Sequence, residues 1–152
     1  MTAISGNPTG RLETGKSRIW IAIAMGLTLP RVQTVLLLPQ LAMFGGDAPD
    51  AWLAPWLSDA ILGLLIPVVL YALLRSKGLR AWGLLLVYNA VGAFDYSHGL
   101  LAQFTDPLPA SIASSSLVYG GIGAGMTFQC IALILLFSRD ARRAFKVHEE
   151  QT

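Results

Sequence analysis

The sequence has few charges and almost no cysteine. Charged residues make up only 13% of the 152 positions, well below the roughly 25% of soluble domains. Cys130 is the single cysteine. It excludes an intrachain disulfide framework and leaves too few thiols for a cysteine-ligated metal site. The basic residues form no dense stripe, so we expect no nucleic-acid partner.

Motifs that carry enzyme chemistry are also missing. The sequence shows no nucleophile paired with a general base, no cluster of metal ligands and no phosphate-binding loop. These absences favour a non-enzymatic protein without deciding the question. No set of motifs identifies a family.

Apolar residues are abundant instead. They make up 54% of the chain, and the mean hydropathy is +0.57. A water-soluble protein of this size would have to hide more apolar surface than its core could hold. A lipid bilayer is therefore the expected solvent for the excess.

Four apolar stretches are long enough to cross a hydrocarbon core of roughly 30 Å. They cover approximately residues 19–44, 58–74, 81–101 and 112–137. We expect a membrane domain over 18–143, a flexible cytoplasmic tail over 1–17 and a second tail over 144–152. An alternative is that residues 19–29 are the apolar region of a signal peptide. Because Pro30 follows at once and no cleavage site is suitably placed, we favour a retained first span.

The basic residues predict how these spans are oriented. Apart from Arg31, every lysine and arginine precedes the first span, joins the second to the third, or follows the fourth. These residues are Arg11, Lys16, Arg18, Arg75, Lys77, Arg80, Arg139, Arg142, Arg143 and Lys146. The other two connections carry acids, namely Asp47, Asp50, Asp59 and Asp106. By the positive-inside rule, the pattern predicts an all-α antiparallel four-helix transmembrane bundle with cytoplasmic termini, in a plasma or bacterial inner membrane.

Tryptophans mark both predicted interfaces. Trp20 and Trp82 lie just inside the cytoplasmic boundary of the first and third spans, and Trp52 and Trp56 fall in the first outer connection. Indole rings are most stable at headgroup depth. We therefore expect all four to be interface anchors, with residues 51–57, interrupted by a proline, lying along the outer interface.

Two charged residues lie deep within the predicted spans. Arg31 is about twelve residues into the first span, or roughly 18 Å deep, and Asp95 is about fourteen residues into the third, or roughly 21 Å. A central arginine in lipid is costly and usually has a partner. Because the two depths match, we predict that Arg31 and Asp95 face each other inside the bundle.

The third span places further polar side chains around this pair. Tyr88 shares the stripe of Asp95 at 100° per residue, and His98 flanks it. Asn89 and Gln129, from the third and fourth spans, come out at equal depth, where their amides could form a hydrogen bond. We expect no cofactor and no metal, because a haem at His98 would lack a second histidine within a span.

Two interpretations of this polar set stay open. Arg31 and Asp95 are either a structural clamp that fixes helix register or the centre of a polar cavity open to the outer face. As a cavity, the set would bind a small ligand or lipid, or support a partner complex. The alternative function is a small oligomeric transporter or channel with both residues in the translocation path.

Small residues and prolines shape the predicted packing. In the fourth span, small residues recur every four positions, which lets backbones approach closely. These residues are Ser116, Gly120 and Ala124, and the pair Gly121 and Gly125. We favour packing within the bundle over a homo-oligomeric seam, and another membrane protein is a further candidate partner. Pro30 and Pro67 predict kinks that free the carbonyls of Gly26 and Gly63.

Overall fold

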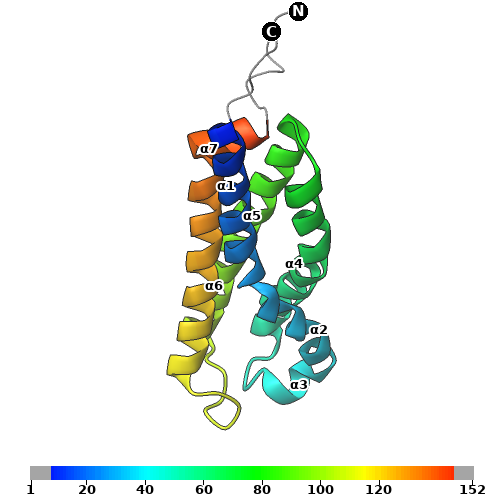
Figure 1. Ribbon diagram of the computed structural model, residues 1–152. Coiled ribbons are helices and arrows are strands. Elements are labelled where there is room, and N and C mark those ends of the chain that lie inside the picture. Colours follow the sequence, from blue (N-terminus) through cyan, green and yellow to red (C-terminus); the bar gives the residue numbers. More distant parts are fainter. Residues whose placement is uncertain (1–7, 146–152) are drawn as a thin grey trace, which may run out of the picture.

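The computed structural model describes residues 8–145, and every regular element in that part of the chain is a helix (Figure 1). The long helices are α1 (Pro8–Gly26), α4 (Asp50–Arg75), α5 (Leu79–Thr105) and α6 (Ser115–Leu136). The short elements are η1 (Leu29–Gln33), α2 (Thr34–Leu37), η2 (Leu38–Gln40), α3 (Leu41–Phe44) and α7 (Arg139–Ala144). The predicted all-helical class is confirmed for the described residues.

The long helices run side by side (Figure 1). Helix α5 packs against both α4 and α6, and α1 packs against α4 and α6. The connection between α4 and α5 meets α7 at one end, where the backbone N–H of Gly78 donates to the carbonyl of Phe145 at 2.8 Å. The segments that carry Arg18, Lys77 and Arg139 therefore lie at the same end of the molecule (Figure 1).

Within the described residues, three segments are long and apolar enough to cross a membrane. They are Lys16–Phe44, Asp50–Arg75 and Ser115–Leu136. Helix α5 is 27 residues long, which is sufficient in length, but it is more polar, and it buries Asn89, Asp95 and Gln103. The apolar pattern thus supports membrane helices, while the crossing by α5 stays a prediction.

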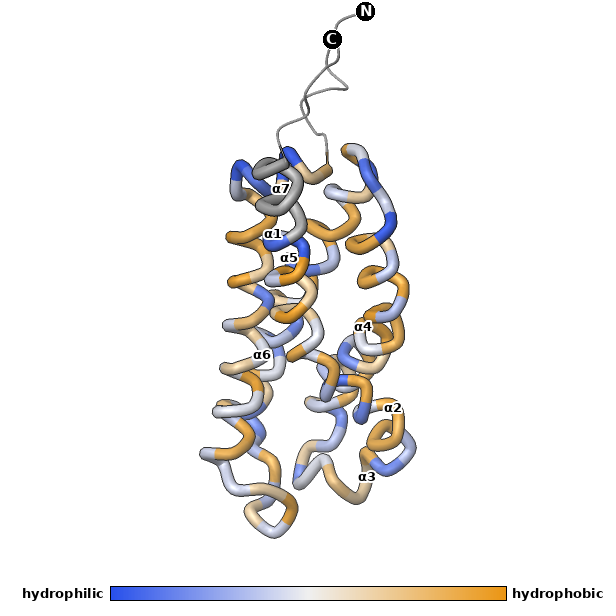
Figure 2. Tube along the Cα trace, viewed as in Figure 1, coloured by the Kyte–Doolittle hydropathy of each residue, from blue (hydrophilic) through white to orange (hydrophobic). Residues whose placement is uncertain are grey.

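The outer surface of the helices is largely apolar. Leu64, Val68 and Tyr71 of α4, Phe104 of α5 and Ile134 of α6 are all exposed. Figure 2 shows apolar residues along the whole length of the long helices. Contiguous apolar surface of this kind is disfavoured in water, and hydrocarbon chains would solvate it.

The first predicted span is not one continuous helix. Helix α1 ends at Gly26, and 3₁₀ turns alternate with single α turns from η1 to α3. Pro30 lacks the N–H that would bond to the carbonyl of Gly26, so the α-helical ladder stops there. The hydroxyl of Thr28 donates to the carbonyl of Met25 at 2.7 Å and so partly replaces the missing backbone bonds. Pro67, in contrast, lies inside α4 without ending it.

Helical structure continues beyond the predicted bounds of the membrane domain at both ends of the described chain. Helix α1 begins at Pro8, within the segment for which a flexible tail was expected. At the other end Phe145 is fully buried, and residues 146–152 of the predicted C-terminal tail lie outside the described residues. The guanidinium of Arg18 donates to the carbonyls of Ser76 at 3.1 Å and Ala144 at 2.8 Å and lies 4.5 Å from the ring centre of Phe145.

Candidate functional site

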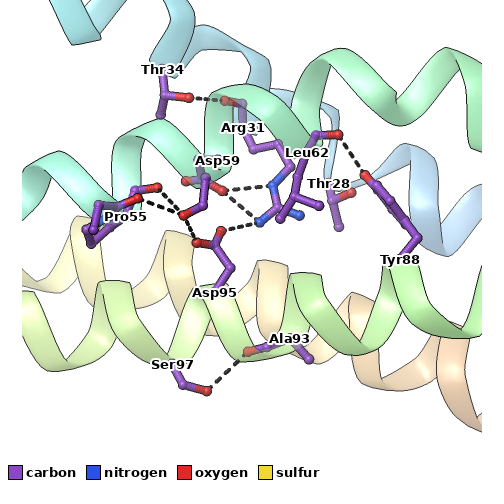
Figure 3. Close-up of polar contacts among 12 residues, drawn as sticks. Thr28, Arg31, Thr34, Pro55, Asp59, Leu62, Tyr88, Ala93, Asp95 and Ser97 are labelled. Carbon is purple, nitrogen blue, oxygen red and sulfur yellow. Dashed lines mark hydrogen bonds and ion pairs between the residues drawn. The ribbon is translucent and has the colours of Figure 1, made fainter.

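One arginine and two aspartates form an ion cluster between the helices (Figure 3). The Nε of Arg31 donates to Oδ1 of Asp59 at 2.8 Å, and its Nη2 lies 2.7 Å from the same oxygen. Nη2 also donates to Oδ2 of Asp95 at 2.7 Å. The structure therefore brings together the two residues matched by depth and adds a second carboxylate. We call Arg31, Asp59 and Asp95 the ion cluster.

The break in the first span brings Arg31 to the cluster. The backbone of η1 lies directly on Gly63 of α4, where an added Cβ would be 2.7 Å from Cα of Val32. Only glycine leaves room for this contact. The hydroxyl of Thr34 donates to the carbonyl of Arg31 at 2.6 Å. Helix α4 thus holds the 3₁₀ turn so that the guanidinium reaches the helix interface.

Side chains of α4, α5 and α6 surround the cluster. The hydroxyl of Ser58 donates to Oδ1 of Asp95, so both oxygens of that carboxylate have a partner. The guanidinium of Arg31 lies 4.5 Å from the ring centre of Tyr96, within cation–π range. The ring of Tyr96 in turn packs on Gly125, where an added Cβ would lie 2.3 Å from it. Gly125 therefore packs within the bundle.

Asp59 is the site residue that sequence reasoning missed. The sequence predicts it in the outer connection, with residues 51–57, interrupted by Pro55, lying along the interface. That expectation was wrong, because α4 begins at Asp50 and includes Pro55. The signal that could have revealed this is the spacing of Trp52, Trp56 and Asp59, which recur at helical intervals and share one face.

Because α4 begins at Asp50, the predicted placement of Trp52 and Trp56 also changes. Trp52 and Trp56 are only 3% and 7% exposed, so they are not interface anchors at the protein surface. Their ring centres are 6.1 Å apart, and Nε1 of Trp52 donates to the carbonyl of Asp106 at 2.8 Å. Trp20, in contrast, is 61% exposed, and Trp82 is half-buried; for these two the anchor role stays a prediction.

A cavity of about 510 Å³ extends from the ion cluster toward the connection between α5 and α6. All three residues of the cluster line it. Its other walls are mainly apolar and aromatic and include Leu37, Phe44, Trp52, Trp56, Tyr96, Leu108, Ile122 and the backbone at Gly121. The cavity therefore combines one strongly polar region with large apolar walls, as small-molecule sites do.

The remaining predicted polar residues do not line the cavity. The hydroxyl of Tyr88 donates to the carbonyl of Leu62 at 3.0 Å. Asn89 donates to the carbonyl of Leu85 at 2.7 Å. The predicted hydrogen bond between Asn89 and Gln129 does not form among the described residues, and both amide atoms of Gln129 are buried without a partner there.

Gln129 lies beside the arginine instead. An added Cβ on Gly92 would be 2.7 Å from Nε2 of Gln129 and 3.1 Å from Nη1 of Arg31. The two side chains thus converge on the same point of α5. Nη1 of Arg31 has no hydrogen-bond partner among the described residues, and it lies on the side of Gly92 and Gln129, which do not line the cavity.

His98 does not belong to the site. It is exposed, and its ring packs edge-on against Phe94 with the centres 4.5 Å apart. Although it follows Asp95 by less than a turn, it lies at the edge of the buried face of α5. Among the described residues, no group of three histidine, cysteine, aspartate or glutamate side chains is arranged to hold a metal ion.

The small residues of α6 divide between two surfaces. Gly125 is buried against Tyr96, and Gly121 lines the cavity. Ser116, Gly120 and Ala124 are exposed on the outer face, so the favoured packing within the bundle applies to only part of the series. No protein-family model, no curated protein and no solved structure matches the chain, so its function is inferred from the residues of the site.

Proposed function

We propose that this is a four-span membrane protein with cytoplasmic termini that binds a small amphipathic ligand or lipid in a cavity near its outer face. Three segments have the length and apolarity of membrane helices. Helix α5 runs beside them with comparable length. The segments that carry Arg18, Lys77 and Arg139 lie at one end of the molecule (Figure 1), which supports the orientation through the positive-inside rule.

The orientation is tested by cysteine labelling. In a Cys130→Ser background, Asp47→Cys and Lys77→Cys place single thiols at exposed positions on opposite ends of the molecule. A membrane-impermeant maleimide should label Asp47→Cys on intact cells and Lys77→Cys only after lysis, because charged reagents do not cross the bilayer. Labelling of Lys77→Cys on intact cells would contradict the proposed orientation.

Ligand binding rests on one observation, the cavity that ends on the ion cluster. Its volume of about 510 Å³ lies within the range of roughly 300–1,000 Å³ that is typical of small-molecule sites. The cluster supplies directional polar contacts, and the aromatic and aliphatic walls supply apolar contact. A purely structural clamp would need the ion pair but would not need a cavity beside it.

Filling the cavity should abolish ligand binding. Gly121 lines the cavity, and an added Cβ there meets nothing within 4 Å, so Gly121→Phe adds a large side chain at the cavity wall without a close contact at its Cβ. Gly120→Phe is the matched control, because Gly120 also has nothing within 4 Å and lies outside the cavity. Native mass spectrometry after mild purification should show a bound molecule on wild-type protein and Gly120→Phe, but not on Gly121→Phe.

Two results of that experiment would contradict ligand binding in the cavity. One is the absence of any retained molecule on the wild-type protein. The other is equal retention by Gly121→Phe and Gly120→Phe, which would place the molecule elsewhere on the surface. Comparison of the helical circular dichroism signal of both variants ensures that only folded proteins are compared.

The alternative function, a small transporter, is favoured by the break in the first span. Discontinuous helices are a recurrent feature of transporter sites, where they present backbone groups and side chains at mid-membrane depth. Here α1 ends at Gly26 and Arg31 follows in η1. Transport differs from binding alone in that the protein must carry the retained molecule across the membrane of a sealed proteoliposome.

A further inference from the structure

The ion cluster contains one base and two acids. Of the residues that line the cavity, Arg31 is the only base, whereas Asp59 and Asp95 are both acids. With both carboxylates ionised, the cluster carries one net negative charge. An unbalanced charge in a low-dielectric environment is costly, so one additional positive charge at the cluster would be stabilised.

The donors of Arg31 without a partner among the described residues belong to Nη1, which does not lie beside the cavity wall. The Nε and Nη2 of Arg31 are both directed to carboxylate oxygens. Its Nη1 lies beside Gly92 and Gln129, neither of which belongs to the cavity wall. A ligand with a carboxylate or phosphate would therefore meet the oxygens of the cluster rather than its guanidinium, and like charges repel.

Asp59 is the member of the cluster that a ligand can reach. Its side chain is 21% exposed, compared with 1% for Arg31 and 5% for Asp95. Its Oδ1 accepts a hydrogen bond from Nε of Arg31 and lies 2.7 Å from Nη2. Its Oδ2 takes no part in these contacts with Arg31. This second oxygen can therefore face a cation while the first stays bound to Arg31.

The walls next to the cluster suit an apolar cation. Trp52 and Trp56 line the cavity within two turns of Asp59 along α4, and aromatic faces attract cations. Leu37, Phe44 and Ile122 continue the apolar wall. We infer that the cavity takes a singly charged organic cation with an apolar body, ion-paired to Asp59. This inference rests on the proposed ligand-binding function.

Two single-chain probes of opposite charge test the inference. Octyltrimethylammonium carries a permanent positive charge, and octanoate carries a negative charge on a similar apolar chain. Binding is followed through the fluorescence of Trp52 and Trp56, with Trp20→Phe introduced to remove the most exposed of the other indoles. The protein is held in phosphatidylcholine nanodiscs, and each titration is repeated on Gly121→Phe to subtract partitioning into the lipid.

The wild-type protein should bind the cation about tenfold or more tightly than octanoate. Asp59→Asn should lower the affinity for the cation by about tenfold or more, because it removes the charge of the side chain and keeps its shape. Asp59→Glu, which keeps the charge, should retain binding. Asp47→Asn is the matched control, since it removes one exposed acid of the loop before α4 and should bind the cation as the wild type does.

The possible outcomes separate the two proposals. Equal affinity for the two probes, or cation binding that Asp59→Asn leaves unchanged, overturns the cationic class. If Gly121→Phe abolishes that charge-independent binding, the proposed ligand-binding function survives. If Gly121→Phe binds the cation as tightly as Gly120→Phe does, or if neither probe binds the wild type, both proposals fail at the cavity.

Discussion

Replacing Arg31 with methionine is expected to lower the free energy of unfolding by about 3–5 kcal/mol, the cost of breaking a buried ion pair by removing one partner. The guanidinium is 1% exposed and contacts both carboxylates of the ion cluster. Without it, Asp59 and Asp95 would be like charges side by side with no cation among the residues of the cavity wall. Methionine fills a similar volume, so packing should change little.

Replacing either aspartate of the ion cluster should cost less stability than replacing the arginine. Asp59→Asn or Asp95→Asn removes one negative charge and leaves a neutral one-to-one pair with Arg31. Each single asparagine variant should therefore lose less stability than Arg31→Met. This order follows from a cluster in which both carboxylates are ionised, whereas an isolated Arg31–Asp95 pair would make the losses at Arg31 and Asp95 similar.

A combined variant separates lost charge pairing from lost packing. The triple substitution Arg31→Met, Asp59→Asn and Asp95→Asn removes all three charges, and it should recover much of the stability lost by Arg31→Met alone. Reversible unfolding in mixed micelles, followed by circular dichroism, gives the free energy of unfolding of the wild type, the three single variants and the triple variant. A loss for Arg31→Met no greater than that for Asp59→Asn would refute the proposed charge imbalance.

Much of this site follows from the sequence because depth in a bilayer constrains position. Arg31 and Asp95 were matched by counting residues from the membrane boundary, and their side chains meet at 2.7 Å. The counting rests on the principle that a charge in lipid needs a partner at its own depth. The same argument predicted equal depth for Asn89 and Gln129, but equal depth does not fix the direction of a side chain, and they form no hydrogen bond.

Other features depended on information that a single sequence does not carry. Asp59 was placed outside the membrane because Pro55 was interpreted as a helix breaker, whereas α4 accommodates that proline near its start. The exact course of the first span after Gly26 depends on the contact between Val32 and Gly63, which are 31 positions apart. The helical wheel put His98 near Asp95 but could not show which neighbouring helix covers each position.

The contact at Gly63 leads to the second large effect. Gly63→Ala is expected to lower the free energy of unfolding by about 1–3 kcal/mol, the usual cost of overpacking, and to abolish ligand binding. The added Cβ would lie 2.7 Å from Cα and 2.8 Å from the backbone nitrogen of Val32. Backbone atoms cannot rotate aside as a side chain can, so η1 would have to move away from α4.

Movement of η1 would open the ion cluster, because Arg31 directly precedes Val32 and Gly63 follows Asp59 by one helical turn on the same face. Gly83→Ala in α5 is the matched control, since an added Cβ there meets nothing within 4 Å, and alanine favours the helix by up to about 1 kcal/mol. Unfolding of both variants, together with the octyltrimethylammonium titration, measures stability and binding in parallel.

Wild-type stability and affinity in Gly63→Ala would show that the 3₁₀ turn can shift without disturbing the guanidinium. In that case, the close packing of η1 on α4 would not position the site. If Gly63→Ala is destabilised and no longer binds the ligand, while Gly83→Ala keeps both properties, the contact of η1 with Gly63 fixes the position of Arg31 beside Asp59.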